Sequence, residues 1–250
     1  GFPKQGQALY EALIAVNKEL QSQLTISEEK INQVIVSESL GAGEPLTGKM
    51  PPQIREELFH EAIHKICSLY LRYVPARGDE IHEILNLREE LRPGTDLQSF
   101  QKRHPAINGN LLQLVLENAY RPYYTALAEI LMKYTDLRDW KKNYCPVCGK
   151  KAALASLDEA GGQRMLWCSF CTTGWPYPRL SCIECDNRDH EELSYFYLED
   201  DRELQIQTCN KCKSYIKTLR RTLFKPEDLP LIDAQTAALD ILAEQQGYRK

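Results

Sequence analysis

Four short cysteine motifs decide the fold of this 250-residue chain: CPVCGK at 145–150, CSFC at 168–171, CIEC at 182–185 and CNKC at 209–212. Two residues between paired cysteines let the backbone form a tight knuckle, in which both sulfurs face one ion. Two knuckles supply the four sulfurs of a tetrahedral site. The sequence therefore predicts two metal ions per chain, bound by Cys145, Cys148, Cys168, Cys171, Cys182, Cys185, Cys209 and Cys212.

The spacing of the motifs indicates which knuckles share an ion. Nineteen residues separate Cys148 from Cys168, and 23 separate Cys185 from Cys209. Each interval fits a β-hairpin or ribbon, and short connections are favoured, so we pair the first knuckle with the second and the third with the fourth. An interleaved pairing, first with third and second with fourth, stays open. A tetrahedral site of four sulfurs suits iron or zinc, and this two-ribbon arrangement suits single ions better than an iron–sulfur cluster.

The alternative roles for these cysteines are disulfides or a redox dithiol. A redox motif is expected as one exposed pair that opens a helix, and four pairs do not fit that context. All eight thiolates are used as ligands, which leaves no coordination position for catalysis and favours a structural role. Tight pairs in a long chain also indicate a reducing compartment, so we expect a cytoplasmic protein.

The remaining sequence predicts an α+β multidomain protein. We expect a helical domain at 1–140, a first rubredoxin-like or zinc-ribbon module at 141–178, a second at 179–225 and a C-terminal helix at 226–250. Strands are expected at 163–167, 193–198 and 203–208, the last two joined by the acidic turn Glu199-Asp200-Asp201. Helices are expected at 6–24, from an N-cap at Ser27 to Val36, at 53–73, from Asp79 to Leu91, from Asp96, at 111–137 with a kink at Pro122, and at 231–247.

A second metal motif occurs in the helical region, because His60-Glu61-Ala62-Ile63-His64 matches the H-E-x-x-H pattern of zinc peptidases. Both histidines fall on the polar side of the expected helix, away from its apolar face. We therefore favour a solvated helix flank and keep a zinc metallopeptidase as the alternative. The ninth cysteine, Cys67, is expected to be an inert small side chain.

Composition argues against two other classes of protein. No apolar stretch is long enough to cross a membrane, and the N-terminus lacks the apolar run of a secretory signal. The formal net charge is −4, which disfavours binding to nucleic acid by bulk charge. A nucleic-acid-binding zinc ribbon stays open because of a basic stripe, formed by Lys211, Lys213, Lys217, Arg220, Arg221 and Lys225. A solvated helix explains this stripe equally well.

The cysteine region resembles the FdhE family of accessory proteins for formate dehydrogenase biogenesis. The resemblance rests on CPVCGK at 145–150, LWCSFCTTGW at 166–175, RLSCIECDN at 179–187 and CNKCKSYIKT at 209–218, and on LIDAQTAALDILAEQQGY at 231–248 with Asp233 and Asp240. It is detailed over about 144–248 and only general before that.

The resemblance implies a helical domain followed by two rubredoxin-like modules that bind metal, with iron as a candidate. It also implies a protein that is not itself an enzyme. Such a protein would bind the catalytic subunit of a molybdenum- or tungsten-containing formate dehydrogenase in the cytoplasm, during maturation or quality control before export. Aromatic residues near the knuckles are expected to serve either as interface anchors or as core: Trp167, Trp175, Tyr195, Phe196 and Tyr197.

Overall fold

The computed structural model describes residues 3–158, 162–198, 201–220 and 224–250, which form two compact units. The helical unit comprises 3–27 and 52–127, and the sheet unit comprises 28–51 and 128–250. Residues 28–51 thus belong with the cysteine region although they lie within the expected helical domain 1–140. The four expected domain ranges differ from this coarser division and stay predictions.

The helical unit is built from α1 (Lys4–Ser22), α3 (Glu56–Tyr73), α4 (Gly78–Asn86), α5 (Leu97–Arg103) and most of α6 (Gly109–Leu131). Helix α3 carries its apolar residues at helical spacing and buries them in one core. Asp96 caps α5 as expected, since its carboxylate accepts from the backbone N–H groups of Gln98 and Ser99. The fully buried part of this core includes Phe59, Ile63, Cys67, Ile81, Ile84, Leu91, Phe100, Val115 and Ala119.

Several expected helices have different bounds in the structure, and three of the differences matter for the fold. The N-cap of the second helix is Asn32 and not Ser27, because α2 (Gln33–Ala42) begins after a short 3-10 turn at Glu28–Lys30. The helix expected from Asp79 to Leu91 ends at Asn86. The single helix expected at 231–247 is two helices, α7 (Leu229–Gln235) and α8 (Ala237–Gln245). Thr236 lies at the break between the two helices, and its hydroxyl donates to the Ile232 carbonyl oxygen at 2.7 Å.

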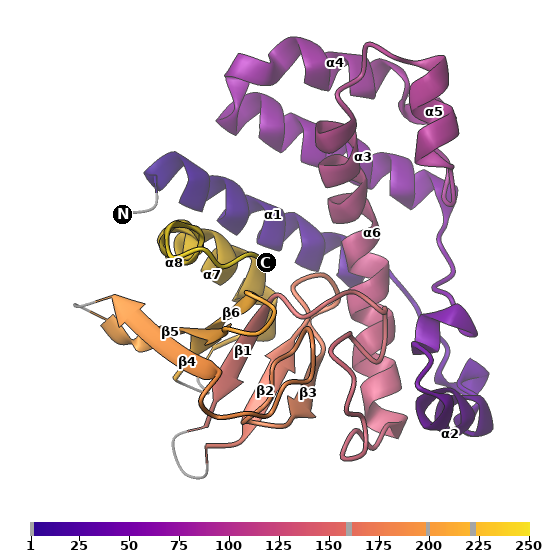
Figure 1. Cartoon of the computed structure of the whole chain (residues 1–250). Helices are drawn as coiled ribbons and strands as arrows, with labels where there is room; N and C mark the ends of the chain where they lie inside the picture. The colour runs from indigo at the N-terminus through magenta and orange to yellow at the C-terminus, as the bar shows by residue number, and fades with distance from the viewer. Residues whose placement is uncertain (1–2, 159–161, 199–200, 221–223) are drawn as a thin grey trace. The chain divides into compact units, whose positions relative to one another are not determined.

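The sheet unit contains one six-stranded sheet with the order β3-β2-β1-β6-β5-β4 (Figure 1). Its neighbouring strands are antiparallel except β1 and β6, which pair in parallel through Ala155–Thr218 and Ser156–Leu219. The two cysteine modules are therefore joined edge to edge. The strands are β1 (Leu154–Leu157), β2 (Arg164–Trp167), β3 (Gly174–Tyr177), β4 (Leu193–Leu198), β5 (Asp201–Cys209) and β6 (Tyr215–Leu219).

Helices α7 and α8 lie against one face of this sheet (Figure 1). A buried lysine anchors them there: Lys217 of β6 is 1% exposed, and its ammonium contacts Asp233 Oδ1 at 2.6 Å and Asp240 Oδ2 at 2.7 Å. It also donates to the Asp233 carbonyl oxygen at 2.8 Å, so three acceptors face its three protons. The Tyr215 hydroxyl donates to Asp240 Oδ1 at 2.8 Å.

The network removes Lys217 from the basic stripe, because its charge is buried and neutralised. Arg221 of that stripe lies outside the described residues, as do Glu199 and Asp200 of the expected turn. The fold class is confirmed: a helical N-terminal region, a β-region with two four-cysteine groups, and C-terminal helices. None of the helices in the described ranges combines the length and apolar character needed to cross a bilayer.

Candidate metal centres

All four knuckles adopt the same backbone conformation. The residue after the second cysteine is left-handed in each, with φ of +75° at Gly149, +61° at Thr172, +52° at Asp186 and +59° at Lys213. Its N–H donates to the carbonyl oxygen of the first cysteine, at 3.0, 3.0, 3.1 and 2.8 Å respectively. Thr172, Asp186 and Lys213 are the only non-glycine residues with positive φ in the described ranges. The left-handed turn is therefore a property of the knuckle and does not require glycine.

A second backbone bond closes each knuckle. The N–H of the first cysteine donates to the carbonyl oxygen two residues after the last cysteine. The acceptors are Lys150, Thr173, Asn187 and Ser214, at 2.8, 2.9, 2.8 and 2.9 Å. Backbone bonds thus hold each pair of sulfurs on one side of a closed turn, as a preformed half-site for a metal ion.

The sulfurs form two groups, and the grouping agrees with the predicted pairing. Cys145, Cys148, Cys168 and Cys171 make the first, Cys182, Cys185, Cys209 and Cys212 the second, with all sulfurs of a group within 4.8 Å of one another. Contacts across the knuckles are 3.4 and 3.5 Å in the first group and 3.5 and 3.8 Å in the second. A tetrahedral site with metal–sulfur bonds of about 2.3 Å has edges of about 3.8 Å. Both groups could therefore hold a metal ion.

Neighbouring polar groups point at the sulfurs. The backbone N–H groups of Cys148 and Glu184 donate to Cys145 Sγ and Cys182 Sγ at 3.5 and 3.4 Å. The hydroxyl of Thr173 lies 3.1 Å from Cys171 Sγ. In the second group the Ser214 hydroxyl lies 3.0 Å from Cys212 Sγ and 3.2 Å from Cys182 Sγ. Such donors stabilise thiolates, the form that binds metal.

Burial and clustering set the protonation of the first group. Burial raises the pKa of Cys145 well above its ordinary value, and it does the same for Cys171. Hydrogen bonds from Cys145, Cys148 and Cys171 lower the pKa of Cys168. In the first group one thiolate is therefore stabilised, whereas ionisation of a further cysteine is unfavourable. A bound cation would stabilise the other thiolates as well. The second group is closer to solvent, since Cys185 is exposed and Cys212 partly exposed.

A segment from the N-terminal half supports the first knuckle. The backbone N–H groups of Leu46 and Thr47 donate to the carbonyl oxygens of Pro146 and Val147 at 2.9 and 3.0 Å. Leu46 is fully buried. These bonds explain why residues 28–51 belong to the sheet unit.

Gly149 lies directly under this segment and is expected to resist substitution. A Cβ at Gly149 would lie 3.0 Å from Cγ of Pro45, whereas one at Gly247, also left-handed with φ of +84°, would meet nothing within 4 Å. Both glycine-to-alanine changes cost about 1–2 kcal/mol for the left-handed backbone. Gly149→Ala should lower the free energy of unfolding of the metal-loaded protein further than Gly247→Ala, as measured by denaturant titration. Equal losses would contradict the contact with Pro45.

The H-E-x-x-H residues of α3 do not form a third group. His60 Nε2 lies 3.2 Å from the Leu91 carbonyl oxygen, and His60 Nδ1 lies 3.4 Å from Glu89. Glu61 pairs with Lys65 at 3.1 Å, and His64 is exposed. In the described part of the chain, only the two cysteine groups bring together metal-ligand side chains of the required number and spacing. His60 differs from the expected solvated flank, because its ring is only 14% exposed.

Cys67 is buried in the core of the helical unit, and burial raises the pKa of its thiol to about 12. It stays protonated at neutral pH, as expected for an inert side chain.

The aromatic residues near the knuckles divide between the two expected roles, core residue and interface anchor. Trp175 is fully buried and Phe196 packs against the α8 core, whereas Tyr195 and Tyr197 are 64% and 38% exposed.

These features define a class: proteins with two four-cysteine groups on one β-sheet, flanked by helices. Comparison with known proteins shows which family the chain is similar to. Residues 144–179 match the family described as "FdhE, central domain". The protein FdhE homolog of Aquifex aeolicus is 36% identical over 58% of this chain and 51% of its own length. That of Haemophilus ducreyi is 32% identical over 50% and 42%. The chain thus spans about half the length of the curated relatives it matches.

A solved structure extends the likeness to the whole fold. The crystal structure of the FdhE protein from Pseudomonas aeruginosa matches with a TM-score of 0.57 and 19% identity, over 100% of this chain and 95% of the other. The family model, the curated relatives and the solved structure all support the predicted resemblance to the FdhE family.

Proposed function

We propose that the protein is a metal-binding accessory protein for formate dehydrogenase biogenesis. In this proposal it binds the catalytic subunit of formate dehydrogenase in the cytoplasm, during maturation or quality control before the enzyme is exported. The family supports the link to formate dehydrogenase. The observation that carries a binding role is the pair of four-cysteine groups on one sheet, which would fix a rigid surface when loaded with metal.

The eight cysteines of the two groups are the proposed metal ligands, with one iron or zinc ion in each group. The donor set supports either metal, because both accept four thiolates in a tetrahedron. Four sulfurs complete the coordination of each ion, so we propose a structural role for the metals and no enzymatic activity for the protein. The peptidase alternative is disfavoured by the engagement of Glu61 with Lys65. The nucleic-acid alternative is weakened by the burial of Lys217.

The test combines a physical and a genetic measurement. The tagged full chain should co-purify with the catalytic subunit of formate dehydrogenase from its native lysate, and a strain that lacks the chain should have reduced formate dehydrogenase activity. A Cys145→Ser variant should neither co-purify with the catalytic subunit nor restore formate dehydrogenase activity to the deletion strain. The Cys67→Ala variant, which changes a cysteine outside the groups, should do both. Normal activity in the deletion strain together with no detectable complex would refute the accessory role.

A further inference from the structure

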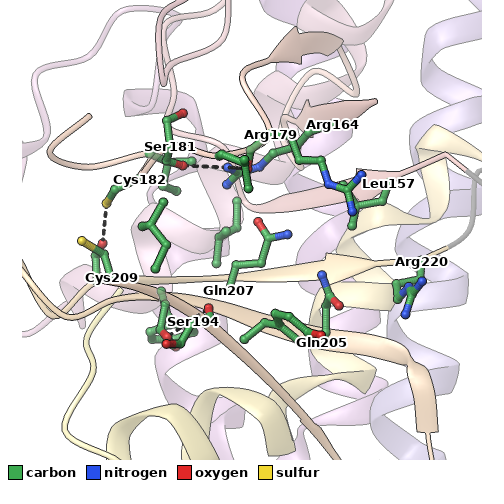
Figure 2. Close-up of a pocket in the computed structure, with 18 residues that line it drawn as sticks. Leu157, Arg164, Arg179, Ser181, Cys182, Ser194, Gln205, Gln207, Cys209 and Arg220 are labelled. Atoms are coloured by element: carbon green, nitrogen blue, oxygen red, sulfur yellow. Dashed lines mark hydrogen bonds between the residues drawn. The ribbon is translucent and has the colours of Figure 1, made fainter. Parts of the chain in front are cut away.

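A pocket lies on the face of the sheet opposite α7 and α8. It has a volume of about 220 Å³ and lies between strands β2, β4, β5 and β6 and the loop that precedes the third knuckle. Figure 2 shows Cys182 and Cys209 of the second cysteine group at one end and Arg220 at the other, with Arg164, Arg179 and two glutamines between. All of the lining residues belong to the sheet unit.

Arg164 of β2 is the buried cation of this pocket, with only 2% of its surface exposed. Its Nη1 donates to the Ser181 carbonyl oxygen at 2.8 Å, and its guanidinium lies 5.6 Å from the Tyr177 ring centre. Its buried Nε has no hydrogen-bond partner among the residues that the structure describes. In the described ranges no carboxylate lies within ion-pair distance of this guanidinium, although buried charges are normally paired.

Burial lowers the pKa of Arg164 to about 10, and the nearby Tyr177 and Cys182 oppose that shift only in part. At neutral pH the side chain is therefore still a cation. A buried cation with an unused N–H donor is the feature that an anionic ligand would complete.

Two further arginines surround the same space. Arg179 and Arg220 both line the pocket and are exposed at the surface, and neither has a carboxylate partner among the described residues. Gly162 leaves room for Arg179, because a Cβ at that glycine would collide with the guanidinium. The amide side chains of Gln205 and Gln207 add neutral donors on β5. Three arginines thus line one small cavity.

We propose that this pocket binds a small oxyanion, a carboxylate or a phosphate, with Arg164 at its floor and Arg179 and Arg220 at its mouth. Guanidinium groups recognise both anions through paired N–H donors. The volume is below the 300–1,000 Å³ that holds drug-sized ligands, which favours an anion of a few heavy atoms over a nucleotide. The site is independent of the formate dehydrogenase proposal.

A competing explanation is that the arginines only balance the second metal centre. Four thiolates around a divalent ion carry a net charge of −2, and two of those thiolates lie at the end of the pocket. Arg220 lies at the opposite end (Figure 2), so charge balance does not explain its position as well as an anion between the arginines does.

Calorimetric titration of the metal-loaded full chain with inorganic phosphate and with succinate, at low ionic strength, tests the pocket and distinguishes the two anions. We expect one anion to bind per chain, and Arg179→Gln and Arg220→Gln each to weaken binding about tenfold or more. Arg188→Gln is the matched control, because Arg188 is exposed, pairs with Asp186 and does not line the pocket. Its affinity should stay within twofold of the unmodified chain.

Arg164→Gln separates the two explanations and should abolish anion binding while the protein keeps its metal. No binding of either anion to the unmodified chain, or undiminished binding in both the Arg179 and Arg220 variants, would overturn the proposal. Metal loss in Arg164→Gln, with unchanged anion affinity in the other two arginine variants, would show that the arginines balance the charge of the second metal centre. That result would also overturn the proposed anion site.

Discussion

Replacing Cys168 with serine is expected to reduce the metal content from two ions per chain to one. Cys168 is buried in the first group, and its sulfur lies 3.5 Å from that of Cys148. A site with three thiolates loses much of a binding free energy that reaches about 10–16 kcal/mol for structural zinc sites. Because strands β1 to β3 have only four residues each, we expect local folding to fail together with metal binding.

Elemental analysis and circular dichroism measure this outcome together. The helical unit has its own apolar core, so most of the helical signal should persist in Cys168→Ser. Cys67→Ala removes a cysteine that belongs to neither group and should keep both ions. Two ions retained in Cys168→Ser would refute the ligand assignment, and loss of the whole helical signal would refute independent folding of the helical unit.

Lys217→Met is expected to destabilise the sheet unit by about 3 kcal/mol, the low end for breaking a buried ion pair. The change leaves the carboxylates of Asp233 and Asp240 facing each other without their shared cation. The low end applies because these side chains are 31% and 25% exposed and because Lys250 lies 3.3 Å from Asp233. The measurement is denaturant unfolding of the metal-loaded chain.

Two further variants make the result specific to the network. Lys211→Met alters an exposed lysine and should change the free energy of unfolding by no more than about 0.5 kcal/mol. Adding Asp233→Asn and Asp240→Asn to Lys217→Met should recover part of the lost stability, because the two carboxylates then no longer face each other and the remaining charge, on Lys250, is 43% exposed to solvent. A Lys217→Met chain as stable as the unmodified protein would contradict an energetic role for the buried lysine.

The cysteine spacing was sufficient to predict the two groups, because short connections between knuckles dominate the choice of partner. The hairpin strand at 193–198 was also predicted with its observed bounds, from an aromatic-rich run that precedes an acidic turn. Both features are determined by residues close together in the sequence.

Features that depend on distant residues were not predicted. Parallel pairing of β1 with β6 joins residues more than 60 positions apart, and no local pattern marks it. Likewise, Leu46 and Thr47 belong to the sheet unit because they donate to carbonyl groups of the first knuckle. The left-handed conformation of Thr172, Asp186 and Lys213 was not predicted. Of the four knuckle positions only Gly149 is a glycine, the residue type from which a left-handed backbone is normally predicted. The preferred N-cap, Ser27, was wrong because Asn32 caps α2 five residues later.

The strand order leaves β3 and β4 at the two ends of the sheet, and these ends are chemically unequal. β3 contains Pro176, which has no N–H to offer to another strand, while the sequence of β4 contains no proline. A strand from a second molecule would therefore be accepted at β4 and resisted at β3. Continuous growth of a fibre needs a receptive edge on both sides of each molecule, so pairing through β4 would stop at two copies.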